Sequence, residues 1–277
     1  MRLYLAGIKI DVETPNLELL APYLEPYSCL EPDSCSEPDH GLEPYCDSDL
    51  DGCGEATGAA EPELAEIRVM VSEEDIAVQR KLTKEGPAGE PQDPGKLSDL
   101  AYEFTALYKK ILHSLVEYKT IYLHGSLIAV DGNGYLFMAP SGTGKSTHAR
   151  LWREVYGDKV KIVNDDKPLF KACGDGGILA CGSPWNGKHG LGCNECVPLR
   201  AVVRLRRGKE NRITELDKSA ALKLLLLSTL RFKDARRVRL MLEVIYRIIE
   251  NVRLYDLECN MEPEAAKTSY ERLVGEQ

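Results

Sequence analysis

The hydrophobic positions of residues 1–118 follow two different periods. Residues 2–20 alternate between apolar and polar side chains, which predicts one or two strands, and residues 65–75 predict another strand followed by a turn. Over residues 97–118 apolar side chains recur every three or four positions, which predicts a helix with Ser98 as its N-cap. The first part of the chain therefore mixes strands and helix.

The middle of the chain predicts a hairpin that runs into a loop and a helix. Residues 120–130 and 135–139 are apolar, and the sequence DGNG between them favours a tight turn. Apolar side chains then recur on one face of residues 146–157, which predicts a helix, and residues 160–163 predict a strand.

The last part of the chain predicts a helix, a helix, a strand and a helix, over residues 218–230, 235–252, 253–259 and 262–274. Strands and helices thus interleave along the whole sequence. The predicted fold class is α/β, with a mainly β core and C-terminal helices packed on it.

Residues 23–62 interrupt the pattern with an acidic insertion. A degenerate repeat of about six residues places prolines where a helix cannot continue, and thirteen carboxylates fall between residues 22 and 67 without any Lys or Arg. The insertion is expected to be irregular. Its cysteines and one histidine leave a metal site open beside the simpler interpretation of an acidic flexible segment: Cys29, Cys35, Cys46, Cys53 and His40.

Charge and composition narrow the classes of partner. The insertion carries more than the whole net charge of −9, so the remainder is mildly basic and gives no reason to expect nucleic acid as a partner. The start of the chain does not resemble a signal peptide, and no apolar stretch is long enough to span a bilayer. The expected location is the cytoplasm, where the nine cysteines, an odd number, are expected to be thiols.

Residues 139–146 (APSGTGKS) match a relaxed P-loop pattern, with Ala in place of the first glycine. The two glycines let backbone N–H groups point inward, and the helix that follows adds its positive end, so a polyanion is the expected occupant. Lys145 is expected to reach the terminal phosphates, and the Ser146 hydroxyl to bind Mg²⁺. The predicted ATP-binding residues are Ser141, Gly142, Thr143, Gly144, Lys145, Ser146 and Thr147.

Two acids and a histidine are the candidate catalytic residues. Asp165 and Asp166 follow the strand at residues 160–163, where one carboxylate can face a metal and the other the proton of an attacking hydroxyl. The alternative is a turn with solvated acids. His124 lies in an otherwise apolar strand, where a histidine is often a hydrogen-bonded core residue.

These motifs in this order resemble the catalytic domain of HPr kinase/phosphorylase, whose fold is related to that of phosphoenolpyruvate carboxykinase. The resemblance rests on "HG", two strands, "SGTGKS", a helix and a strand ending in "DD". It covers residues 118–170 well and extends more weakly to residue 205. The chain is most similar to HPr-kinase-related bacterial proteins, including those that phosphorylate serine in peptides.

The resemblance implies an ATP-dependent, Mg²⁺-dependent kinase that phosphorylates a hydroxyl, most simply serine of a peptide or protein. It gives His124 a role beside the acids and makes one of the two acids the general base and the other a neighbour of the metal. Asp165 is preferred as the base and Asp166 as the metal ligand, but the choice between them stays open. Residues 118–277 would then be the catalytic region, and residues 1–117 an N-terminal region with the insertion. A homo-oligomer is compatible with this interpretation.

The family pattern is incomplete here. The N-terminal domain of its bifunctional members is not apparent, and their "E-I-R-G" segment is matched only by "VPLRAV", which includes Arg200 without an acid in register. Phosphorylase activity and HPr as the substrate are therefore not predicted.

A glycine-rich stretch over residues 181–200 predicts an irregular loop. It is interpreted as a flap over phosphates or substrate, with an exposed Trp185 and with Asn186, Lys188 and Arg200 as candidate contacts, or as a plain connecting loop. A single CxxC pair within it, Cys193 and Cys196, leaves a zinc site as a minor alternative.

Two other functions stay open at this level. A kinase for a small hydroxyl metabolite such as free serine predicts a closed pocket beneath the Trp185 loop. A nucleotide-binding regulatory or scaffold module predicts ATP binding without phosphate transfer, with a partner recruited by the acidic insertion.

Overall fold

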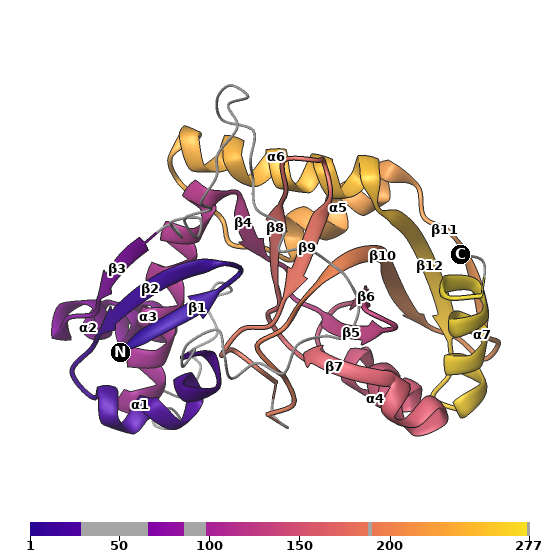
Figure 1. Cartoon of the computed structure of the whole chain (residues 1–277), viewed down its shortest axis with the longest axis horizontal. Helices are drawn as coiled ribbons and strands as arrows, with labels where there is room; N and C mark the ends of the chain where they lie inside the picture. Colours follow the sequence, from indigo (N-terminus) through magenta and orange to yellow (C-terminus); the bar gives the residue numbers. More distant parts are fainter. Residues whose placement is uncertain (29–65, 86–97, 188–189, 276–277) are drawn as a thin grey trace, which may run out of the picture. The chain divides into compact units, whose positions relative to one another are not determined.

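A computed structural model describes residues 1–28, 66–85, 98–187 and 190–275 (Figure 1). Most of the acidic insertion, with the candidate metal ligands Cys29 to Cys53, lies outside these residues. The chain is a mixed α/β protein, as the interleaved periods predict. It forms two compact units, one of residues 1–107 with 173–175 and the other of residues 108–172 with 176–277.

The first unit contains a three-stranded sheet in the order β1 (Arg2–Leu5), β2 (Ile8–Glu13) and β3 (Glu66–Met70). The antiparallel β1–β2 pair is joined by a two-residue turn at Ala6 and Gly7, whose φ angles of 52° and 69° match the right-handed twist of the strands. Strand β3 pairs with β2 in parallel. The alternation of residues 2–20 thus gives two strands.

The helices of this unit are α1 (Leu17–Leu24), α2 (Glu73–Glu85) and the first half of α3 (Asp99–Leu115), with a short 3-10 turn η1 (Glu25–Tyr27). Helix α3 confirms the predicted helix, and its Ser98 hydroxyl accepts a hydrogen bond from Ala101 N at 3.3 Å. Helix α2 forms where the sequence predicted only a turn. The prediction missed it because many of its residues are charged and no clear apolar period is visible.

The second unit contains a nine-stranded sheet. Its main order is β4 (Thr120–Tyr122), β8 (Leu169–Ala172), β9 (Ile178–Cys181), β10 (Cys196–Arg207), β6 (Asn133–Met138), β5 (Ser126–Val130) and β7 (Val160–Asn164). Strand β12 (Arg253–Cys259) pairs with β10 and with β11 (Arg212–Glu215). The long strand β10 is parallel to both β6 and β12 and antiparallel to β9, so it joins the two halves of the sheet.

Helices cover both faces of this sheet (Figure 1). Helices α5 (Lys218–Leu227) and α6 (Ala235–Asn251) pack on one face, and α4 (Lys145–Tyr156) and α7 (Pro263–Leu273) pack on the other. Alternate side chains of β6 point to opposite faces of the sheet: Leu136 and Met138 pack on the α6 side, and Tyr135 and Phe137 pack on the α4 side. Strands buried on both faces have nearly continuous apolar sequences, as β5 and β6 do.

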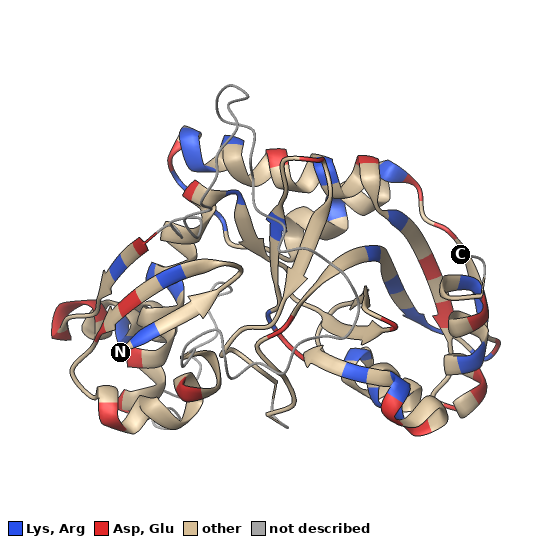
Figure 2. Cartoon of the chain, viewed as in Figure 1, with Lys and Arg blue, Asp and Glu red and all other residues tan. Residues whose placement is uncertain are grey.

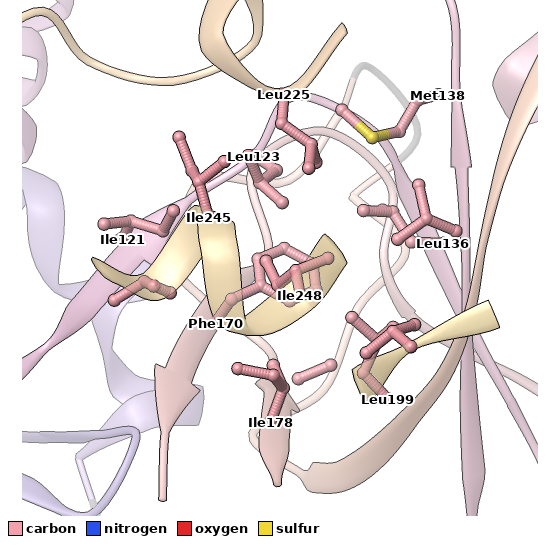
Figure 3. Packing of buried hydrophobic residues seen from close by; sticks show 14 of the residues in the cluster. Ile121, Leu123, Leu136, Met138, Phe170, Ile178, Leu199, Leu225, Ile245 and Ile248 are labelled. Atoms are coloured by element: carbon pink, nitrogen blue, oxygen red, sulfur yellow. The ribbon is translucent and has the colours of Figure 1, made fainter. Parts of the chain in front are cut away.

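The core on the α6 side is built around aromatic and branched side chains. Phe170 of β8 is fully buried, and Figure 3 shows it among Ile178, Leu199, Ile245 and Ile248 from neighbouring strands and from α6. Charged side chains lie along α6 and α7, whereas the β5–β6 hairpin carries charge only at its turn (Figure 2). This contrast follows from burial of the hairpin and exposure of one side of each helix.

Several local expectations need correction. The strand predicted over residues 120–130 is broken at residues 123–125, since β4 pairs with β8 and β5 pairs with β6. The predicted hairpin is therefore β5–β6, with Asp131 and Gly132 at positive φ. The irregular loop ends at Glu195, because the sequence CVPLR begins β10.

The cysteines also differ from the expectation of free thiols. Cys181 of β9 and Cys196 of β10 are directly opposite in the antiparallel ladder, with Cα atoms 4.0 Å apart, and form a disulfide. This pairing removes Cys196 from the CxxC zinc alternative. Within the described ranges, no three His, Cys, Asp or Glu side chains gather where they could hold a metal, and none of the helices there is long and apolar enough to cross a membrane.

Candidate functional site

The glycine-rich loop, residues 139–144, connects the end of β6 to the start of α4. Gly142 and Gly144 have φ angles of 77° and 119°, and a side chain at these angles would be strained. Thr143 N donates to Pro140 O at 3.2 Å, and His148 N donates to Gly144 O at 2.8 Å to open the helix. The positive end of the α4 dipole thus lies at the loop.

A pocket of about 680 Å³ lies against this loop. Three further segments reach it: the β4–β5 connection, the end of β7 and the segment after β9. Its lining includes ten of the residues singled out in the sequence, namely His124, Ser141, Gly142, Gly144, Lys145, Ser146, Thr147, Asp165, Asp166 and Asn186, together with Arg150 and Gly187. Thr143 lines a second pocket.

Asp165 is held by a neutral partner. Its Oδ1 accepts a 2.7 Å hydrogen bond from the buried hydroxyl of Ser126, at the start of β5. Its Oδ2 carries no hydrogen bond within the part of the chain that the structure describes. A Cβ atom at Gly187 would lie 3.2 Å from this Oδ2, so the glycine lets the loop backbone pass close to the carboxylate.

Asp166 is held by a histidine and a lysine. His124 Nδ1 lies 2.8 Å from its Oδ1, and Lys167 Nζ pairs with its Oδ2. Burial acts to raise the pKa of Asp166, but the hydrogen bond from His124 and the charge of Lys167 outweigh it and hold the pKa below its ordinary value. The two adjacent carboxylates therefore have different environments, and Asp166 is the one fixed as an anion.

Lys145 begins helix α4 with its side chain turned inward. The residue is buried, and its Nζ donates a 2.9 Å hydrogen bond to Ala139 O at the base of the loop. Burial lowers the pKa of Lys145, while Asp166 and Asp165 act in the opposite direction. The ammonium thus lies between the glycine-rich loop and the two acids.

Asn164, the last residue of β7, connects the acids to the segment after β9. Its Oδ1 accepts hydrogen bonds from Asp166 N at 2.9 Å and Lys167 N at 2.7 Å. Its Nδ2 donates to Ser183 O and to Asn186 Oδ1 at 3.0 and 2.9 Å. One fully buried amide therefore fixes both the turn that carries Asp166 and the position of Asn186.

Two of the predicted substrate contacts, Trp185 and Arg200, are not brought to the pocket. Trp185 is only 5% exposed and packs on Tyr108 with ring centroids 4.9 Å apart, so the expectation of an exposed Trp185 is wrong. Arg200 Nε donates to Asn133 Oδ1 at 2.6 Å, at the end of β6 opposite the loop and about 17 Å along the strand from it. Lys188 lies outside the described residues. Of the three predicted contacts that the structure describes, Asn186 alone lines the pocket.

Sequence reasoning missed the arginine that the structure places beside the loop. Arg207 at the end of β10 donates from its guanidinium to Gly142 O, and to Thr143 O at 3.3 Å. Because β10 is parallel to β6, with Arg204 opposite Met138, the residues after Arg204 reach the loop that follows β6. Only knowledge of this pairing could have distinguished Arg207 from Arg200.

The oxygen donors at the pocket fit a hard cation such as Mg²⁺. Magnesium usually binds through one or two protein carboxylates or hydroxyls together with substrate phosphates, rather than through a complete protein cage. Ser146 and Asp166 supply that donor set on the two sides of the pocket. The assignment of these two residues to a metal stays a prediction, and in this structure both oxygens of Asp166 have protein partners.

The described geometry is that of an α/β protein in which a glycine-rich loop at the start of a helix faces two carboxylates across one pocket. Over residues 99–263, more than half of its length, the chain matches the family model of the SynChlorMet cassette protein ScmC, and the chain belongs to that family. A structure of the Hpr(Ser) kinase/phosphatase from Coxiella burnetii is 15% identical, with a TM-score of 0.32, over 56% of this chain and 99% of that chain. No curated protein matches the chain.

Proposed function

We propose that this chain is an ATP-dependent phosphotransferase that phosphorylates a hydroxyl, most simply serine of a peptide or protein, with Mg²⁺. The observation that carries the proposal is the single pocket lined by the glycine-rich loop, Lys145, Asp165 and Asp166. These groups come from β6, α4 and β7, and they combine anion-binding donors with an acid pair.

The loop side of the pocket would hold the β- and γ-phosphates. The donors there would be backbone N–H groups of the loop and of the first turn of α4, apart from that of Thr143, together with the hydroxyls of Ser141 and Thr147 and the Lys145 ammonium. Binding would draw Lys145 Nζ from Ala139 O toward the terminal phosphate. Magnesium, held by Ser146 and Asp166, would neutralise charge on the phosphates.

Asp165 fits the general base better than Asp166 does. Its Oδ2 is the carboxylate oxygen without a described hydrogen bond, whereas both oxygens of Asp166 have partners, His124 on one side and Lys167 on the other. Asp165 would take the proton of the acceptor hydroxyl as the hydroxyl oxygen bonds to the γ-phosphorus and the bond to the β-phosphate oxygen breaks, which leaves ADP. His124 and Lys167 would keep Asp166 ionised and in place.

The test is transfer of labelled γ-phosphate from ATP, with Mg²⁺, to serine peptides, candidate protein acceptors and free serine. Lys145→Ala and Asp165→Asn should each abolish transfer, whereas only Lys145→Ala should strongly weaken ATP binding. Lys159→Ala and Asp158→Asn provide matched controls, because both residues are exposed just beyond α4.

The outcomes separate the alternatives. Label in peptides, lost in both site variants, supports the proposal, and label in free serine alone moves the acceptor to a small molecule. A regulatory module would be favoured by three results together. ATP would bind through Lys145, no acceptor would be labelled, and the Asp165→Asn variant would still bind a partner.

A further inference from the structure

A second pocket of about 340 Å³ is lined in part by the glycine-rich loop. It shares Gly144 and Thr147 with the first pocket, so the two are adjacent at the start of α4. Its other walls come from α4, the end of β10 and the end of β12. A ligand with its phosphates at the loop could therefore extend directly into the second pocket.

The walls of the second pocket are chemically unlike those of the first. Leu151, Leu205, Cys259 and Met261 give it an apolar lining, and it contains no carboxylate from the described residues. Arg206 also lines it, but its guanidinium is paired with Asp256 and Glu258. An apolar pocket with few polar groups suits a flat, uncharged ring system rather than phosphates or an acidic peptide.

Arg207 lies at the junction of the two pockets. Its guanidinium donates to the carbonyls of Gly142, which lines the first pocket, and Thr143, which lines the second. No carboxylate partner of Arg207 is found in the described ranges. Its positive charge is thus placed where a nucleotide would pass from its phosphates to its nucleoside.

His148 adds a buried polar group to the second pocket. Its Nε2 contacts Ser269 Oγ and Trp152 Nε1 at 3.1 and 3.2 Å, while its Nδ1 has no hydrogen-bond partner among the described residues. Because that nitrogen is itself buried, the imidazole contributes a wall of the pocket rather than a hydrogen bond to a ligand.

We propose that the second pocket binds the nucleoside half of ATP, with the base against Leu151, Leu205 and Met261 and with Arg207 beside the phosphate nearest the ribose. This inference rests on the proposed binding of ATP phosphates at the loop. It adds a base-binding site and an arginine contact that the loop motif alone does not contain.

Calorimetric titration of the full chain with ATP and with inorganic tripolyphosphate, both with Mg²⁺, tests the assignment. Met261 is 70% exposed, so Met261→Asp should leave the fold intact while weakening ATP binding about tenfold or more, with tripolyphosphate binding unchanged. Met70→Asp is the matched control, because Met70 is also exposed and belongs to the first unit. Arg207→Gln should weaken ATP binding, whereas Arg212→Gln at an exposed position of β11 should not.

Thiol labelling provides a second measurement without any substitution. Cys259 is a free thiol in the wall of the second pocket, and Cys193 is a free thiol that does not line it. ATP should slow maleimide labelling of Cys259 relative to Cys193, as read by mass spectrometry, and tripolyphosphate should not.

The two proposals fail in different ways. If neither ATP nor tripolyphosphate binds, the proposed function is wrong. If both bind equally well through Lys145, with Cys259 unprotected and Met261→Asp without effect, only the nucleoside pocket is wrong. If Met261→Asp instead raises the KM for the acceptor and leaves ATP binding unchanged, the second pocket belongs to the acceptor and the nucleoside assignment is overturned.

Discussion

His148 should make the stability of this fold depend on pH between 7 and 5. The imidazole is 2% exposed on α4, lies edge-on to the Phe137 ring at 4.7 Å, and shares hydrogen bonds with Trp152 and Ser269. Burial lowers its pKa from 6.5 to about 4, because a charged imidazole in this apolar layer would lose its hydration. The folded protein therefore resists protonation where the unfolded chain accepts it.

The sign and size follow from this difference in pKa. His148 in the unfolded chain binds a proton near pH 6.5, and in the folded chain only near pH 4. The stability that neutral His148 preserves is therefore fully present above pH 6.5, and it is lost as the pH falls from 6.5 to 4. One pKa unit corresponds to about 1.4 kcal/mol, so the whole shift corresponds to roughly 3 kcal/mol. Of this, about 2 kcal/mol should be lost between pH 7 and pH 5.

Urea unfolding at pH 7 and pH 5, followed by tryptophan fluorescence, measures the effect. His148→Gln keeps a polar partner for Trp152 and removes the titrating group, so its free energy of unfolding should lose about 2 kcal/mol less than that of the unchanged chain. His113→Gln is the control, because His113 is a partly buried histidine whose pKa burial also lowers. Parallel losses in the unchanged chain and in His148→Gln would refute the reasoning.

Three further changes test the core, the loop and the acid pair. Phe170→Ala removes a fully buried ring and should cost about 3–5 kcal/mol of unfolding free energy in a denaturant titration, against at most about 0.5 kcal/mol for Leu227→Ala, whose side chain is 64% exposed. Gly144→Ala places a Cβ at a φ of 119°, so it should lower the free energy of unfolding by about 1 kcal/mol or more in the same titration and weaken ATP binding. Unchanged affinity for ATP would mean that this backbone angle does not matter for the site. Asn164→Ala leaves the backbone N–H groups of Asp166 and Lys167 without their acceptor, so it should lower kcat far more than it changes the KM for ATP. Asn164→Asp keeps that acceptor and should recover part of kcat. A fall in stability without any effect on kcat would contradict this role.

Local signals explain what could be predicted from the sequence. The tight turn at Asp131, the two glycines before Lys145 and the acids after β7 each depend on residues within a few positions, so their backbone conformations are set where they stand in the chain. These elements also supply most of the pocket lining. The α/β class followed from the same local periods.

Pairings between distant segments explain what could not be predicted. Arg207 rather than Arg200 lies beside the loop because β10 runs parallel to β6, and Cys196 meets Cys181 because β10 also pairs with β9. Trp185 is buried against Tyr108, which is far away in the sequence.

The sequence by itself determined the strand–loop–helix unit, the identity of its donors and the order of the acids that follow. The tertiary structure alone decided which of two adjacent acids is fixed by a histidine and a lysine, which arginine reaches the loop, and that a second, apolar pocket adjoins the first. The physical reason is that periodicity and turn preferences act over a few residues. Charge pairing and pocket shape instead depend on residues that only the folded sheet brings together.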